Sequence, residues 1–130
     1  MEDDLIARLL ADSRLSALVD NRVNYLFRVQ GEPLPAISIT HVAPGRAYTM
    51  DGPQGTHGTW MQFDIWADRA ATAIAILAAM RVVLEAPAKV GATAFMMGFE
   101  KSRRDSVEDE AGGGEVARIS VDYSIWWLPA

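Results

Sequence analysis

Apolar and polar residues alternate most regularly in residues 59–67, and the pattern then changes abruptly. From Met61 to Ile65 every second residue is apolar, which is the period of a half-buried strand. Residues 70–85 instead repeat apolar side chains at the spacing of a helix, and a proline follows as a stop. We therefore expect a strand that runs directly into a helix, with Asp68 as the helix N-cap.

The predicted helix over 70–85 is apolar nearly all the way round. One face is expected to carry Ile74, Leu77, Met80 and Leu84, and the apolar residues expected off that face are Ile76, Ala79 and Val83. A helix of this kind is covered on more than one side. It therefore either packs under a sheet with loops above it or meets another subunit.

The remaining elements follow from the same two periods. They are a helix over 2–18 that breaks or restarts at 12–13, with Arg8 and Arg14 on its polar side, a short strand or extended segment over 23–29, a strand over 36–42, a long loop over 44–58, a strand over 91–100, a polar hairpin tip over 101–115 and a strand over 116–128. This order predicts an α+β fold in one domain over residues 1–130. Its sheet should be mostly antiparallel, with four to five strands and two helices packed on one face.

The sheet face that points away from the helices should be polar with aromatic residues among the polar ones. Its members are expected to be Gln62, Asp64, Asp122, Ser124, Trp60, Trp66 and Trp126. Tryptophans among polar groups suggest a surface that is covered in an assembly. The alternative is that these rings lie at sheet edges under loops.

Composition narrows the function classes. The chain has 130 residues, a formal net charge of -5 and no cysteine. The charge disfavours wrapping of nucleic acid by the whole domain, and the lack of cysteine excludes disulfides and thiol catalysis. The acidic N-terminus is unlike a signal peptide, and the sequence contains no apolar run of membrane-spanning length.

Candidate chemistry is sparse. There are two histidines, His41 at the end of a predicted strand and His57 in the glycine-rich loop. Either could form a metal site with Asp51 or Asp64, but isolated histidines at strand ends are usually solvated or hydrogen-bonded. The glycines at 112–114 lack the lysine and hydroxyl residue of a phosphate loop. The residues alone therefore indicate a binding or structural domain with no cofactor.

Five stretches, taken in order, resemble the small tail-completion or tail-terminator proteins of long-tailed bacteriophages and gene transfer agents. They are residues 9–19, 34–39, 48–53, 62–67 and 118–126, so the resemblance covers almost the whole chain. The chain departs from the family pattern at the Asp20-Asn21 turn, where a glycine is more usual. A second departure is the acidic, glycine-rich hairpin over 105–115.

The resemblance implies a structural virion protein, not an enzyme, that forms a hexameric ring on the end of the tail tube. The ring would stop polymerisation of the tube and provide the joint to the DNA-filled head. The implied partners are further copies of the chain, the tail-tube protein and a head connector protein, and DNA would pass through the ring without specific binding. The protein would be assembled in the bacterial cytoplasm and would remain at the head-tail junction of the virion.

Three sets of residues are candidates for these roles. Excess apolar surface suggests subunit contacts at Trp60, Trp66, Ile76, Val83 and Trp126. Acids that could line the lumen and repel DNA are Asp64, Asp122, Asp105, Glu108, Asp109 and Glu110. The long loop could dock on the tail-tube or connector protein through Arg46, Tyr48 and Asp51.

Two alternatives stay open. A head-to-tail connector or stopper protein would have a similar size and acidity and would also lack catalytic residues. A metal-dependent hydrolase would need His41 or His57 as a ligand, and the sequence offers few further ligands for it.

Overall fold

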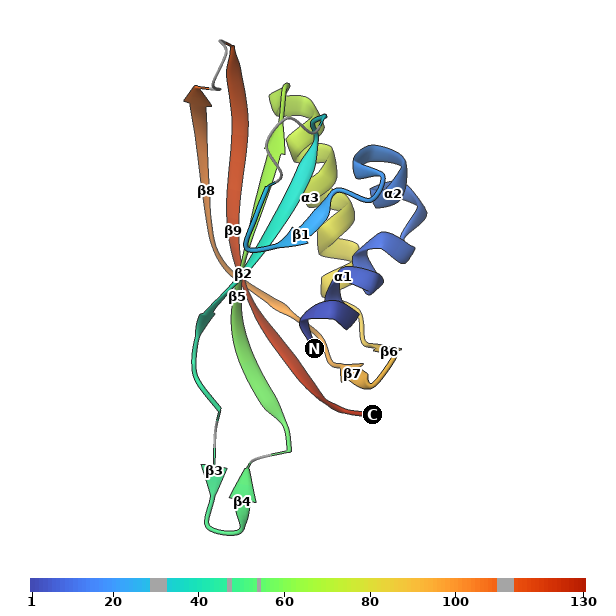
Figure 1. Ribbon diagram of the computed structural model, residues 1–130, viewed down its shortest axis with the longest axis vertical. Helices are drawn as coiled ribbons and strands as arrows, with labels where there is room; N and C mark the ends of the chain where they lie inside the picture. Colours follow the sequence, from blue (N-terminus) through green and yellow to red (C-terminus); the bar gives the residue numbers. More distant parts are fainter. Residues whose placement is uncertain (29–32, 47, 54, 110–113) are drawn as a thin grey trace.

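The protein is an α+β domain in which three helices cover one face of a long, twisted sheet (Figure 1). A computed structural model describes residues 1–28, 33–46, 48–53, 55–109 and 114–130. Its helices are α1 (Glu2–Ala11), α2 (Ser13–Val19) and α3 (Ala70–Leu84). Its strands are β1 (Val23–Tyr25), β2 (Ala36–Ala43), β3 (Tyr48–Thr49), β4 (Gly52–Pro53), β5 (His57–Ala67), β6 (Ala88–Val90), β7 (Thr93–Phe95), β8 (Phe99–Asp109) and β9 (Glu115–Pro129).

The sheet is organised around its two longest central strands. Its order is β1-β2-β5-β9-β7-β6, and β8 pairs with the part of β9 that β7 leaves free. Within the described residues, β1 and β2 form the only parallel pair. β3 and β4 form a separate two-stranded sheet. The sheet is therefore mostly antiparallel, as predicted, but its seven strands exceed the expected four to five.

The core lies between β5, β9 and the helices. Phe63 on β5 stands opposite Ile39 on β2 and Val121 on β9, and all three side chains are buried. The ring of Phe63 meets the ring of Tyr123 edge to face at a centroid distance of 5.9 Å. Burial, together with the hydrogen bond from its hydroxyl to Glu85, raises the pKa of Tyr123. The alternation predicted for these two strands is confirmed.

Helix α3 packs differently from the prediction. Its buried residues are Ala73, Ile76, Leu77, Ala79, Met80 and Leu84. Leu77, Met80 and Leu84 of the expected face are buried as predicted, whereas Ile74 is 52% exposed and Ile76, which was expected off that face, is a core residue. The helix contacts β5 and β9 on one side and α1 and α2 on another. A sequence that is apolar all round could not show which side faces the sheet.

The start of α3 also differs from the expectation. The N-cap is Arg69 instead of Asp68, and among the described residues no side chain caps this end by a hydrogen bond. The helix predicted over 2–18 does restart at residues 12–13, as one of the two alternatives expected. Asp12 is extended, and its carboxylate accepts a hydrogen bond from the Leu15 amide at 3.1 Å, so that α2 begins at Ser13.

Arg8 is buried and joins α1 to the end of α3, although its position in the sequence suggested a polar surface. Its guanidinium donates hydrogen bonds to the carbonyl oxygens of Val83 and Ala86, and it lies 5.2 Å from the Phe95 ring centroid. The Val83 carbonyl belongs to the last turn of α3, where a positive charge is favourable, and Ala86 follows just after the helix. Burial lowers the pKa of Arg8.

The segment predicted as a polar hairpin tip is mostly a strand. β8 runs from Phe99 to Asp109 and pairs with β9 along residues 115–124. Its side chains are mostly polar and exposed, apart from the apolar Phe99 and Val107, and it is an edge strand that the helices do not cover. The predicted strand over 91–100 is divided between β7 and the start of β8.

Two further predicted segments also differ from the structure. The long loop over 44–58 contains the β3–β4 hairpin. The predicted strand over 23–29 is shorter as β1, and its last residue, Val29, lies outside the described residues.

Within the described residues, the structure contains no helix with the length and apolarity needed to cross a membrane.

The anchoring role of Arg8 is tested by replacing it with methionine, which keeps an unbranched chain and removes the donors. The carbonyl oxygens of Val83 and Ala86 then lose their hydrogen-bond donor at a position that is shielded from solvent. We expect the free energy of unfolding to fall by about 1–3 kcal/mol in urea titrations. Arg14→Met is the matched control, since the Arg14 side chain is 58% exposed, and it should change stability by less than about 0.5 kcal/mol. Equal effects would show that the Arg8 hydrogen bonds do not stabilise the fold.

Candidate assembly surfaces

The sheet face opposite the helices carries a network of charged groups centred on Asp64. This carboxylate accepts hydrogen bonds from Arg118 at 3.0 and 3.2 Å and from the Ser120 hydroxyl at 2.7 Å. Gln62 donates to the same carboxylate at 3.2 Å. Because β5 and β9 place these side chains opposite one another on the same face, Asp64 is only 5% exposed.

Asp122 is held in the same way two pairs further along the ladder, at the next pair on this face. It accepts from the Ser102 hydroxyl at 2.8 Å and from Arg104 at 3.3 Å, both on β8. It is 3% exposed. Arg118 additionally pairs with Glu108 on β8. The network therefore joins three strands and places the arginines above the carboxylates.

The three candidate tryptophans also lie on this face. Trp60 and Trp66 belong to β5 and Trp126 to β9, which are central strands of the sheet and not its edges. Cations cover two of the rings: the Lys101 amino group lies 4.0 Å from the Trp60 centroid, and two arginines, Arg28 and Arg118, lie 4.8 and 4.7 Å from that of Trp66. Trp126 lies across Gly58 and stays 39% exposed.

A second surface is an apolar groove on the helix side, between α3 and the β8–β9 hairpin. Its volume is about 230 Å³, and its apolar lining includes Ala73, Ile74, Val107 and Ile119. Ile74 is 52% exposed and Val107 is 66% exposed. Asp105 also lines the groove and is paired with Arg103, and the hydrogen bond from Arg103 lowers the pKa of Asp105. We call this surface the α3–β8 groove.

A third surface is the β3–β4 hairpin, which projects from one end of the molecule (Figure 1). We call this hairpin the arm. Met50 in its turn is fully exposed, and Tyr48 is 68% exposed. An isolated two-stranded hairpin is marginally stable in water. The arm is thus built to be held by contacts outside its own strands.

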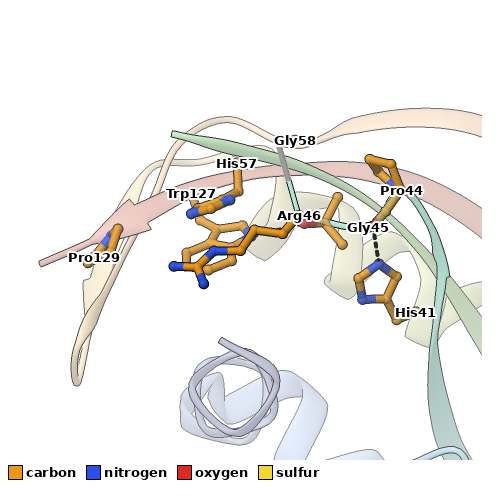
Figure 2. A pocket seen from close by; sticks show the side chains of 9 residues that line it. His41, Pro44, Gly45, Arg46, His57, Gly58, Trp127 and Pro129 are labelled. Carbon is orange, nitrogen blue, oxygen red and sulfur yellow. Dashed lines mark hydrogen bonds between the residues drawn. The ribbon is translucent and has the colours of Figure 1, made fainter. Parts of the chain in front are cut away.

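A cavity of about 330 Å³ lies at the base of the arm (Figure 2). Its lining includes His41, Arg46, His57 and Trp127. The His57 ring stacks on that of Trp127 at 4.4 Å, and the Trp127 indole donates to the Thr59 hydroxyl at 3.0 Å. The cavity thus has an aromatic wall with a cationic side chain beside it.

The metal site considered from the sequence is not supported by this arrangement. His41 is hydrogen-bonded to the Pro44 carbonyl oxygen at 2.8 Å. Asp64 lies in the network with Arg118, and Asp51 lies in the turn of the arm. Across the part of the chain that the structure describes, no three residues among His, Cys, Asp and Glu are grouped so that they could hold a metal ion.

Residues 3–128 match the family described as tail completion protein gp17. The chain belongs to this family. It is therefore a structural protein of a phage-type tail and a component of the virion. The family description agrees with a structural role instead of an enzymatic one.

A solved structure described as the virion of a native gene transfer agent (GTA) particle contains a chain with the same fold. The match has a TM-score of 0.63 at 19% identity and covers 100% of this chain and 95% of that chain. The search of curated proteins found no match.

The burial of each candidate contact residue determines whether it can take part in a subunit interface. Ile76 is 0% exposed and cannot meet a neighbouring subunit in the folded protein, so its assignment is corrected. Val83 is half-buried, and the large apolar residues exposed on α3 are Ile74 and Val82. Sequence reasoning missed Ile74 and Val107 as exposed groups, whereas the exposed Met50 belongs to the long loop that the sequence indicated as a binding segment.

The candidate lumen acids divide into two groups. Asp64, Asp122, Asp105 and Glu108 each have an arginine partner. Asp109 at the end of β8 is exposed, and Glu110 lies outside the described residues. Asp64 and Asp122 therefore lie beneath the surface, where their charges are compensated.

A stability comparison separates a structural acid from a surface acid. Asp64→Ala leaves the donors of Arg118 and Ser120 without their acceptor, and we expect the free energy of unfolding to fall by about 1–3 kcal/mol. Asp109→Ala, at an exposed position, should change it by less than about 0.5 kcal/mol. Both are measured by urea denaturation at neutral pH. A negligible loss of unfolding free energy for Asp64→Ala would show that the Asp64 carboxylate does not stabilise the sheet.

Proposed function

We propose that this tail protein assembles as a ring of six subunits on the end of the tail tube, stops its polymerisation and presents the joint to the head. The observation that carries this proposal is the pair of unlike apolar surfaces, the arm and the α3–β8 groove, on a chain of a tail completion family. A cyclic assembly requires two different patches per subunit, one of which meets the other on its neighbour.

The proposed subunit contacts use exposed and half-buried apolar groups. On the sheet face these are Trp60, Trp66 and Trp126, and on α3 they are Val83 and Ile74, which replaces Ile76. Partly exposed tryptophans are frequent anchors of interfaces because they cover a large area with few rotatable bonds. The cations above Trp60 and Trp66 would form a polar rim around them.

The lumen is proposed to be lined by the tip of the β8–β9 hairpin. Asp109 is exposed there, and Glu110 follows it in the sequence. Uncompensated negative charge would keep passing DNA from binding to the wall. The partnered acids Asp64 and Asp122 are assigned to the sheet network instead.

Contact with the tail-tube or connector protein is proposed at the base of the arm. The cavity there combines Arg46 with the stacked rings of His57 and Trp127. An arginine beside aromatic rings is a composition that recurs at protein interfaces. No catalytic step is assigned to these residues.

The ring is tested by light scattering and negative-stain imaging of the protein, alone and after addition of purified tail tubes. We expect particles of six subunit masses with a central hole, either free or on one end of each tube. Tubes that carry the protein should no longer grow when further tail-tube protein is added. Trp66→Asp should prevent ring formation, because it places a charge in a tryptophan contact.

The matched control for Trp66→Asp is Asp68→Asn, an exposed substitution two residues further along the chain. It should leave ring formation unchanged. Binding to the purified head portal, with no effect on tube growth, would instead identify a connector protein and overturn the proposal.

A further inference from the structure

We propose that the arm of one subunit docks in the α3–β8 groove of the next, with Met50 inside the groove and Asp51 at the start of α3. This inference rests on the proposed ring, and it names the contact by which the ring closes. Tyr48 and Asp51, which the sequence suggested for docking on the tail-tube or connector protein, are assigned here to the neighbouring copy.

The arm carries an apolar tip that its own subunit does not cover. Its two strands pair through Tyr48 with Pro53 and Thr49 with Gly52. Gly52 has a φ of 125°, a conformation that L side chains rarely adopt, and it closes the turn that presents Met50 to solvent. A flexible methionine held at the end of a hairpin is suited to filling an irregular apolar groove.

The α3–β8 groove offers the complementary shape and polarity. It is open to solvent, and its walls are apolar at Ile74 and Val107. The exposed positions of α3 other than Ile74 hold only small or apolar side chains, at Ala71, Ala75, Ala78 and Val82, besides Ala70 in the groove lining. Small side chains allow another backbone to approach closely.

The charges agree with this pairing. The groove opens beside the start of α3, where the N-cap is the exposed Arg69 and, among the described residues, no side chain accepts from the first amides. The start of a helix favours an anion. Asp51, next to Met50, would supply one. Asp105, which lines the groove, and Glu108 are both paired with arginines, so their negative charges are compensated.

The two surfaces lie at opposite ends of the subunit. In Figure 1 the arm projects from the lower end, whereas the start of α3 and the β8–β9 hairpin lie at the upper end. The arm therefore cannot reach the groove of its own subunit, and the contact must join two copies. A contact between unlike surfaces propagates from copy to copy and closes into a ring when the rotation permits.

Cysteine cross-linking tests this contact directly, because the natural sequence contains no cysteine. The double variant Met50→Cys/Val107→Cys is oxidised under conditions in which the wild type forms rings, with tail tubes present if they are required. We expect a ladder of covalent oligomers that ends at the ring size. The single variants Met50→Cys and Val107→Cys should give no species beyond a dimer.

A matched pair controls for chance collisions. The control variant is Met50→Cys/Phe99→Cys. Phe99 is an exposed apolar residue of β8, the strand that also carries Val107, and it lies eight positions from Val107 and outside the groove. It should give no ladder. A ladder from this pair as well, or none from the Met50/Val107 pair in intact rings, would overturn the arm contact and leave the ring standing. Failure of the wild type to form rings on tubes would overturn both proposals.

A charge substitution gives an independent measurement. Met50→Asp should raise the protein concentration needed for half-maximal ring assembly by about tenfold or more, because a charge would enter the apolar groove. Its melting temperature as a monomer should equal that of the wild type, since Met50 is fully exposed. Unchanged assembly, or binding of tail-tube protein lost while rings persist, would assign the arm to the tube and refute the contact between copies.

Discussion

The antiparallel ladder between β5 and β9 is the constraint on which the other parts depend. Eleven consecutive pairs, from His57 with Trp127 to Ala67 with Ala117, fix which side chains face the helices and which face away. The same register places Phe63 beside Val121 in the core and Asp64 beside Ser120 on the opposite face. A shift by one residue would exchange the two faces, so apolar burial and the charged network select the same alignment.

The charged network decides what the sheet face can offer to partners. Asp64 and Asp122 are covered by arginines, and the rings of Trp60 and Trp66 lie under cations. The outer layer of this face therefore contains aromatic rings and cations, with Glu108 paired to Arg118, although the chain as a whole carries a net charge of -5. The position of charge, more than its sum, determines which surfaces would meet DNA and which would meet protein.

The domain leaves apolar groups exposed at both ends, at Met50 on the arm and at Ile74 and Val107 in the α3–β8 groove. Its core does not need them, because the helices and the central strands already bury a continuous cluster. Exposed apolar groups at two separate sites suit a tail protein that acts in an assembly. Membership of a tail completion family and a fold shared with a chain of a gene transfer agent particle are consistent with that use.

The sequence by itself determined the two central strands, the helix between them, the α+β class and the family, because alternation and helical spacing are local properties. The tertiary structure alone decided which side of α3 is buried, since a helix that is apolar all round carries no directional signal. It also decided the burial of Arg8 and the continuation of β8 through a polar segment, because both depend on partners distant in the sequence. Whether an acid such as Asp64 is free or paired is likewise set by the neighbouring strand, which brings Arg118 to it from 54 residues away.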